Sequence, residues 1–164
     1  MASRWYVLCS KPHKEQTLSQ QLQSQGFEIY CPRFFEPNDK SGKFQVKPYF
    51  PGYLFVRFDP NMVGISKFQW MPNTEGLVSF GLTPAYVPDA MLEAIQRHVD
   101  QLNLASGGSF SSSDSENKFE TKNEDSRLKE YGTIFDPKNS SDERVRELLR
   151  MLQGMNVSAT TRDI

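Results

Sequence analysis

The side chains best placed for chemistry in this chain are aromatic, and they lie in the run from Pro48 to Phe58. The run has the aromatic and β-branched composition of a strand, and it contains a Pro-Gly bend. Because side chains alternate along a strand, Tyr53, Phe55 and Arg57 share one face. Exposed rings beside an arginine bind protein partners or stack on nucleic-acid bases. The sequence therefore predicts a binding surface on this face, with helices covering the other.

The titratable residues form no catalytic or metal-binding pattern. His13 and His98 lack cysteine or carboxylate neighbours at metal-ligand spacing. The sequence contains no phosphate-binding loop, nucleophile elbow, Cys-x-x-Cys pair or EF-hand loop. Cys9 and Cys31 fall in apolar strands, where buried thiols are usually inert. We therefore expect a protein that is not an enzyme and that binds no metal, cofactor or small-molecule substrate.

Composition argues against a general nucleic-acid binder. The formal net charge is −1 over 164 residues, whereas such proteins usually carry a basic excess that neutralises phosphate. Residues 52–58 are nevertheless close to the signature of the RNA recognition motif, whose rings stack on single-stranded bases. Pro51 stands where that signature has a basic residue, and Leu54 where it has a small one. A stand-alone RNA-binding module and an aromatic strand that only packs both stay open as alternatives.

Polar side chains near the N-terminus offer a weaker signal. Lys11, Lys14 and Gln21 lie in or beside the first predicted helix. Such groups contact DNA phosphates and base edges in many complexes, but a solvated helix face accounts for them equally well. No apolar run approaches the length of about 18 residues that is needed to span a bilayer, and no signal peptide precedes Trp5. With only two cysteines, these features predict a cytoplasmic protein without membrane contact.

The elements that position these residues follow an α+β pattern. Strands are predicted near residues 5–9, 27–35, 53–58 and 77–81, and helices at 13–25 and from Pro88 onward. The later helix carries apolar residues at helical spacing: Met91, Leu92, Ile95, Val99 and Leu102. Residues 61–71 are ambiguous. The order β-α-β-β-(α)-β-α predicts an open antiparallel sheet, a sandwich with helices mainly on one face.

Composition changes sharply after Leu104. We predict a domain at 1–104, a Ser-rich flexible linker at 105–126 and a C-terminal segment at 127–164. A helix is expected at 141–153, from a capping-box pattern at 140–143 and apolar residues at helical spacing: Val145, Leu148, Leu149 and Leu152. One apolar stripe cannot form a core alone. This helix must lie on the aromatic face of the domain or associate with another copy of itself.

Several motifs, taken in order, resemble the N-terminal domain of the NusG family of transcription elongation factors over residues 4–104. They are Trp5-Tyr, Pro32 at the end of a strand, Pro-x-Phe-Pro-Gly-Tyr-x-Phe-Val at 48–56, Leu-Val-x-Phe-Gly at 77–81, and Val87-Pro88. Residues 55–59 and 84–88 look closer to the specialised RfaH-like branch than to housekeeping NusG.

The resemblance implies a partner. In that family this domain straddles the RNA polymerase cleft, binds the clamp helices of the β′ subunit and resists pausing and termination. Carried over by position, the polymerase-binding residues are Phe50, Pro51, Tyr53, Phe55, Phe80 and Ile95. A second contact, to the gate loop of the β subunit, falls near residues 64–67. The RfaH-like branch also contacts non-template DNA, and Lys11 matches a basic position of that branch. Lys14 and Gln21 are the further candidates for DNA contacts, although Gln21 stands where the branch tends to have a basic or DNA-contacting residue.

The C-terminal segment departs from the family pattern. Family members usually end in a small β-barrel, whose opening motif is absent here. Residues 131–135 and 157–164 resemble later strands of that barrel, but a barrel without its first strands would leave open edges. In RfaH-like factors a helical tail masks the polymerase-binding surface. The resemblance thus implies an autoinhibitory role for the 141–153 helix.

Overall fold

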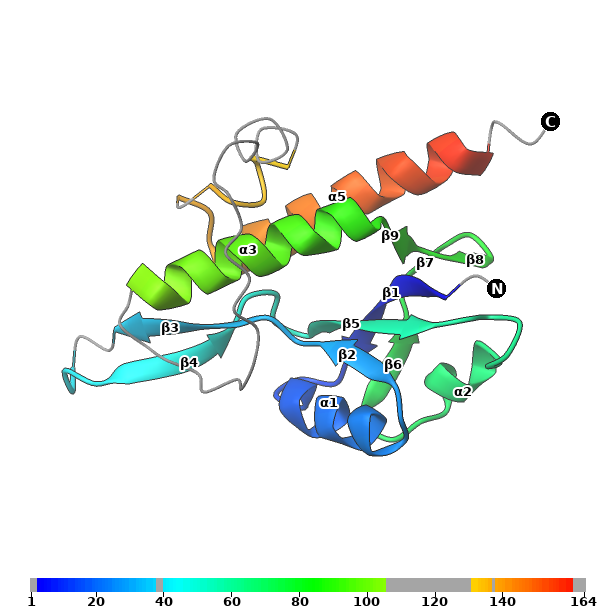
Figure 1. The fold of residues 1–164 in the computed structure, drawn as a ribbon, viewed down its shortest axis with the longest axis horizontal. Helices are drawn as coiled ribbons and strands as arrows, with labels where there is room; N and C mark the ends of the chain where they lie inside the picture. The colour runs from blue at the N-terminus through cyan, green and yellow to red at the C-terminus, as the bar shows by residue number, and fades with distance from the viewer. Residues whose placement is uncertain (1–2, 38–39, 106–130, 137, 161–164) are drawn as a thin grey trace, which may run out of the picture.

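The computed structural model describes residues 3–37, 40–105, 131–136 and 138–160 and has an α+β fold (Figure 1). Its main sheet is antiparallel, with strands in the order β2-β5-β1-β6 and with β9 also paired to β1. These strands are β1 (Arg4–Ser10), β2 (Glu28–Tyr30), β5 (Tyr53–Phe58), β6 (Thr74–Leu77) and β9 (Tyr86–Val87). The predicted α+β class with antiparallel sheet is confirmed.

Two hairpins lie outside the main sheet, and because of them two of the predicted strands are wrong in their bounds. β3 (Arg33–Pro37) pairs with β4 (Phe44–Pro48), and β7 (Ser79–Phe80) pairs with β8 (Thr83–Pro84). The strand predicted at 27–35 is therefore two strands. Pro32 separates them, because proline has no N–H to donate to a sheet ladder. The strand predicted at 77–81 is likewise divided between β6 and β7.

The described residues contain the helices α1 (Glu15–Ser24), α2 (Ser66–Gln69), α3 (Asp89–Ala105) and α5 (Ser141–Thr160). Helix α1 ends in a Schellman motif: Gly26 has φ +89°, its N–H donates to the Gln23 carbonyl, and the Phe27 N–H donates to the Leu22 carbonyl. The helix predicted at 141–153 is confirmed but continues past Gly154. Residues 157–160, which resemble a barrel strand in sequence, are helical in the structure, and 161–164 lie outside the described residues.

Helices cover both faces of the main sheet, so the prediction of helices mainly on one face was wrong. On one face, Leu18 and Leu22 of α1 and Phe68 of α2 pack with Leu54 and Val56 of β5. On the other face, α3 and α5 both lie over the sheet (Figure 1). Most of the linker predicted at 105–126 falls outside the described residues. None of the described helices is long and apolar enough to cross a membrane.

Candidate functional site: an aromatic surface shared with the C-terminal segment

The residues predicted to bind a partner gather on one side of the sheet. We call them the aromatic surface: Phe50, Pro51, Tyr53, Phe55, Phe80 and Ile95. Phe50, Phe55 and Ile95 are fully buried in one apolar cluster, and Tyr53 and Phe80 are half-buried at its border. Phe50 and Phe55 meet edge to face, with ring centroids 6.0 Å apart. Sequence reasoning thus found residues that the fold brings together, but it expected them to be exposed.

A tight turn fixes the position of Phe50 relative to β5. The Tyr53 N–H donates to the Phe50 carbonyl at 3.1 Å, and Gly52 has φ +84°. Proline at the second and glycine at the third position are typical of a type II turn. Glu15, the first residue of α1, accepts a hydrogen bond from the Gly52 N–H at 2.8 Å. The N-terminal helix therefore braces the turn, a role for Glu15 that the sequence alone did not indicate.

The C-terminal segment completes the apolar cluster. Tyr131, Ile134, Leu148 and Leu152 are buried in it, together with Phe50 and Phe55. Half-buried members from the same segment are Phe135, Val145, Met151 and Met155. Leu149, which was predicted to belong to the apolar stripe, is half-buried and is not among the residues of this cluster. The apolar stripe of α5 that faces the domain therefore consists of Val145, Leu148, Met151, Leu152 and Met155.

Polar contacts hold the same segment at both ends of α5. Asn156 accepts a hydrogen bond from the Tyr86 N–H and donates one to the Tyr86 carbonyl, each at 3.3 Å. The Tyr49 hydroxyl donates to the Ile134 carbonyl at 3.3 Å. The Arg144 guanidinium lies over the Tyr49 ring, with its central carbon 4.4 Å from the ring centroid. The helix is thus fixed in register on the domain as well as packed against it.

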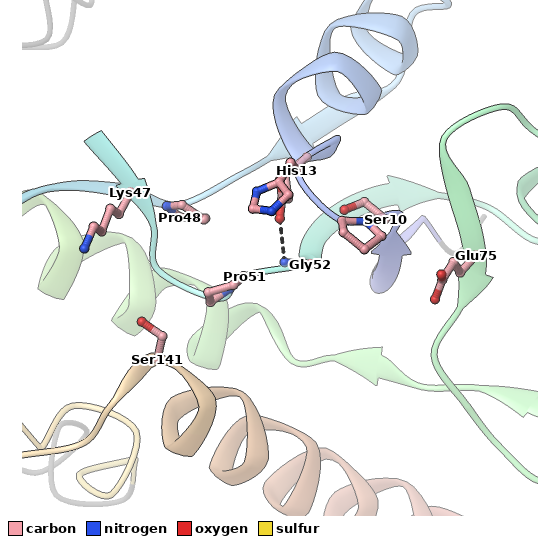
Figure 2. Close-up of a pocket in the computed structure, with 10 residues that line it drawn as sticks. Ser10, His13, Lys47, Pro48, Pro51, Gly52, Glu75 and Ser141 are labelled. Atoms are coloured by element: carbon pink, nitrogen blue, oxygen red, sulfur yellow. Dashed lines mark hydrogen bonds between the residues drawn. The ribbon is translucent and has the colours of Figure 1, made fainter. Parts of the chain in front are cut away.

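A cavity of about 540 Å³ lies where α5 begins. Its walls include Pro12 and His13, the turn residues Pro51 and Gly52, and Ser141. Figure 2 shows Ser141, the first residue of α5, across the cavity from Pro51. The start of the C-terminal helix therefore meets the domain at the turn that positions the aromatic surface.

The predicted DNA-contacting residues differ in exposure. Lys11 and Lys14 are exposed, whereas Gln21 is half-buried and its Oε1 accepts a hydrogen bond from Asn73 at 3.3 Å. The two thiols are separate and half-buried. Burial raises the pKa of Cys31 to about 11, and burial followed by the nearby Glu75 carboxylate raises the pKa of Cys9. Both thiols are therefore poorly ionised at neutral pH, as expected for unreactive cysteines.

The described residues contain no group of three or more histidine, cysteine or acidic side chains able to hold a metal ion. Sequence reasoning missed Tyr131, Ile134, Met151, Met155 and Asn156 as parts of the site. A signal for the methionines was present, because 148, 151, 152 and 155 follow helical spacing. No comparable periodicity marks Tyr131 and Ile134, which lie in consecutive turns.

The fold is thus an antiparallel α+β domain whose aromatic surface is shared with a C-terminal segment. The family model described as "Transcription termination factor nusG" matches residues 3–96, more than half of the chain. The protein therefore belongs to the NusG family of transcription factors.

One solved structure that the chain resembles is that of NusG from Thermotoga maritima, titled "Domain interaction in Thermotoga maritima NusG". The sequences are 19% identical, and the match covers 72% of this chain and 63% of that chain, with a TM-score of 0.42. The chain thus spans just under two thirds of the length of that protein.

Proposed function

We propose that the protein is a transcription elongation or antitermination factor of the RfaH-like kind, which acts in the cytoplasm without catalysis. In this proposal the aromatic surface binds the clamp helices of the RNA polymerase β′ subunit, and the complex suppresses pausing or termination. Membership of the NusG family supports the class of function. The clamp contact is what the resemblance of residues 48–56 and 77–81 implies.

The observation that carries the proposal is the shared apolar cluster. Phe50, Phe55 and Ile95 pack with Leu148 and Leu152, which come from a separate C-terminal segment. Each large apolar side chain buried against a partner contributes roughly 1.5–3 kcal/mol before association costs. A surface that the protein's own helix can bury is therefore also apolar enough to bind a helical partner of similar character.

The same cluster supports autoinhibition by α5. While Leu148 and Leu152 occupy the cluster, no other helix has access to Phe50 or Phe55. Binding of polymerase then requires that the C-terminal segment leaves the domain, which lowers the apparent affinity by the fraction of open molecules. Contacts of residues 64–67 with the gate loop, and of Lys11 and Lys14 with non-template DNA, would add to the clamp contact. Gln21, which is engaged by Asn73, is the weakest of these candidates.

Retention of the protein on immobilised core RNA polymerase tests the proposal. Leu148→Glu puts a charge into the buried cluster, which is costly enough to displace the helix, so we expect several-fold more protein to be retained. Leu149→Glu is the matched control, because Leu149 is the adjacent leucine outside the cluster, and we expect wild-type retention. Adding Tyr53→Ala to Leu148→Glu should reduce retention, because half-buried Tyr53 belongs to the proposed contact surface.

Equal retention of the wild type and Leu148→Glu would contradict masking, and full retention after Tyr53→Ala would contradict the contact surface. The alternative, a stand-alone RNA-binding module that stacks bases on Tyr53 and Phe55, is tested by a gel shift with single-stranded RNA in the absence of polymerase.

A further inference from the structure

Arg144 is held on the domain by aromatic rings. Its guanidinium carbon lies 4.4 Å from the centroid of Tyr49 and 5.0 Å from that of Phe34. Its Nη2 donates to the Ser141 hydroxyl at 3.2 Å, whereas its Nε is buried and has no hydrogen-bond partner. None of the ion pairs between described residues includes Arg144. A half-buried cation stabilised by ring faces and not by a carboxylate is sensitive to a second positive charge nearby.

A side chain close to Arg144 that can acquire such a charge is His98 of α3, since both contact the Tyr49 ring. Its ring stacks on Phe135, with centroids 4.4 Å apart and planes 28° apart, and it meets Tyr49 edge-on at 5.9 Å. Phe135 and Arg144 both come from the C-terminal segment, whereas His98 and Tyr49 come from the domain. Docking of the segment therefore buries His98 further and brings the arginine toward it.

Burial, followed by the positive charge of Arg144, lowers the pKa of His98 below its ordinary value of 6.5. The elements around His98 also carry other charged or titratable side chains: Asp89, Glu93, Arg97 and Asp100 of α3, Arg33 and Glu36 of β3, Lys47 of β4, Tyr49, and Tyr131, Asp136, Lys138, Asp142, Glu143, Arg146, Glu147 and Arg150 of the C-terminal segment. Among them, Glu36 pairs with Lys47 and Glu147 with Arg150. The charge that lowers the pKa of His98 is that of Arg144.

We propose that Arg144, His98 and the rings of Phe34, Tyr49 and Phe135 form a proton-sensitive latch, and that protonation of His98 releases the C-terminal segment from the domain. The regulatory role of the latch rests on the proposed masking of the aromatic surface. Release of the C-terminal segment does not, because it can occur and be measured without polymerase. Acidification would then expose the aromatic surface in the absence of any partner.

The direction of the pH effect follows from linkage. A histidine whose pKa is lower when the segment is docked stabilises docking above pH 6.5, and this stabilisation is lost as the pH falls through 6.5 toward the docked-state pKa. One proton with an ordinary pKa near 6.5 can raise the undocked fraction by up to about tenfold between pH 7.5 and 5.5. Asp100 has the opposite effect, because burial raises its pKa and so favours the folded state in acid.

Hydrogen exchange of the Tyr86 amide tests the latch in the full chain. This N–H donates to the Asn156 side chain, so its exchange reports departure of α5. The quantity to compare is the protection factor, which is the exchange rate of an unstructured peptide divided by that of the protein at the same pH. We expect protection to fall by up to about tenfold between pH 7.5 and 5.5 in the wild type.

His98→Phe keeps a ring against Phe135 but cannot be protonated, so its protection factor should not change with pH. His13→Gln is the matched control: His13 is the only other histidine in the chain and is exposed, so wild-type pH dependence should persist. Arg144→Gln should move the transition to higher pH and reduce its size, because the pKa of His98 rises when the cation is removed. Should His98→Phe dock poorly, His98→Gln serves in its place.

The latch is overturned if the wild type shows no loss of protection in acid, or if the loss persists in the His98 variants. These outcomes are independent of polymerase. If Leu148→Glu were retained on polymerase no better than the wild type, the proposed masking would be overturned but the latch would stand. If the protection factor of the wild type did not change with pH, the latch would be overturned but the masking would stand.

Discussion

The two faces of the main sheet are buried by different parts of the chain. On the α1 face, the apolar cluster is formed by residues between Tyr6 and Tyr86, all within the N-terminal domain. On the α3 face, the cluster runs from Trp5 to Leu152 and depends on the C-terminal segment. A core closed by its own domain is inseparable from folding, but a core closed by a distant segment can open while the domain stays folded.

Both faces combine apolar packing with polar contacts. On the α1 face the rings of Phe58 and Phe68 lie with centroids 4.6 Å apart, Lys67 lies over the Phe27 ring, and Glu15 of α1 accepts a hydrogen bond from the Gly52 N–H. The α5 contact has Arg144 over two rings and the Asn156 side chain on the Tyr86 backbone. The difference between the faces is therefore the part of the chain that closes each of them, not the kind of contact.

The largest expected effect comes from deleting a buried leucine on each face. Leu54→Ala and Leu152→Ala remove the same atoms from fully buried positions, at a cost of about 2–5 kcal/mol each. We expect Leu54→Ala to reduce hydrogen-exchange protection on both faces, because it lowers the free energy of unfolding of the whole domain. Leu152→Ala should reduce protection only at the α5 contact. Equal loss across the domain in both variants would show that the faces are not separable.

A smaller effect is expected from the two asparagines that bind backbone groups. Asn156→Ala leaves the Tyr86 N–H and carbonyl without their partner and should weaken docking by about 1–3 kcal/mol. Asn103→Ala is the matched control, because Asn103 of α3 binds the Phe35 N–H and Arg33 carbonyl in the same way. It should destabilise the β3-β4 hairpin and leave docking intact. Exchange of the α5 amides and of the β4 amides separates the two results.

The smallest effect is expected at the start of α5. The Ser140 hydroxyl accepts a hydrogen bond from the Glu143 N–H at 3.3 Å, and Glu143 accepts one from the Ser140 N–H at 2.7 Å. Ser140→Ala should destabilise the helix by about 1 kcal/mol, measured as lower exchange protection in its first turns. Ser24→Ala removes a hydroxyl at the end of α1 and should leave α5 unchanged. Loss of protection at α5 in that variant would contradict the independence of the two faces.

Much of the fold follows from local patterns in the sequence. The spacing of Met91, Ile95 and Val99 predicts α3, and the run from Tyr53 to Phe58 predicts β5; both elements are present. The capping box at 140–143 is also confirmed by its two hydrogen bonds. These signals are reliable because capping and apolar periodicity act between residues only a few positions apart.

Other features could not be derived this way. The extension of α5 beyond Gly154 goes against the low helix propensity of glycine, which costs about 1 kcal/mol and is outweighed by packing of Met155 and the hydrogen bonds of Asn156. In the sequence, Arg144 is indistinguishable from the other charged residues on the polar face of the helix. Its position over Phe34 and Tyr49 depends on how two distant segments meet.

The sequence by itself determined the α+β class, the principal helices and strands, and the aromatic residues that gather on one face, because these depend on short-range spacing. Only the tertiary structure decided that this face is closed and which residues close it. That outcome depends on contacts between residues such as Phe50 and Leu148, which are far apart in the chain. Such contacts form where two apolar surfaces of matching shape exclude water together, and no pattern within either segment specifies the match.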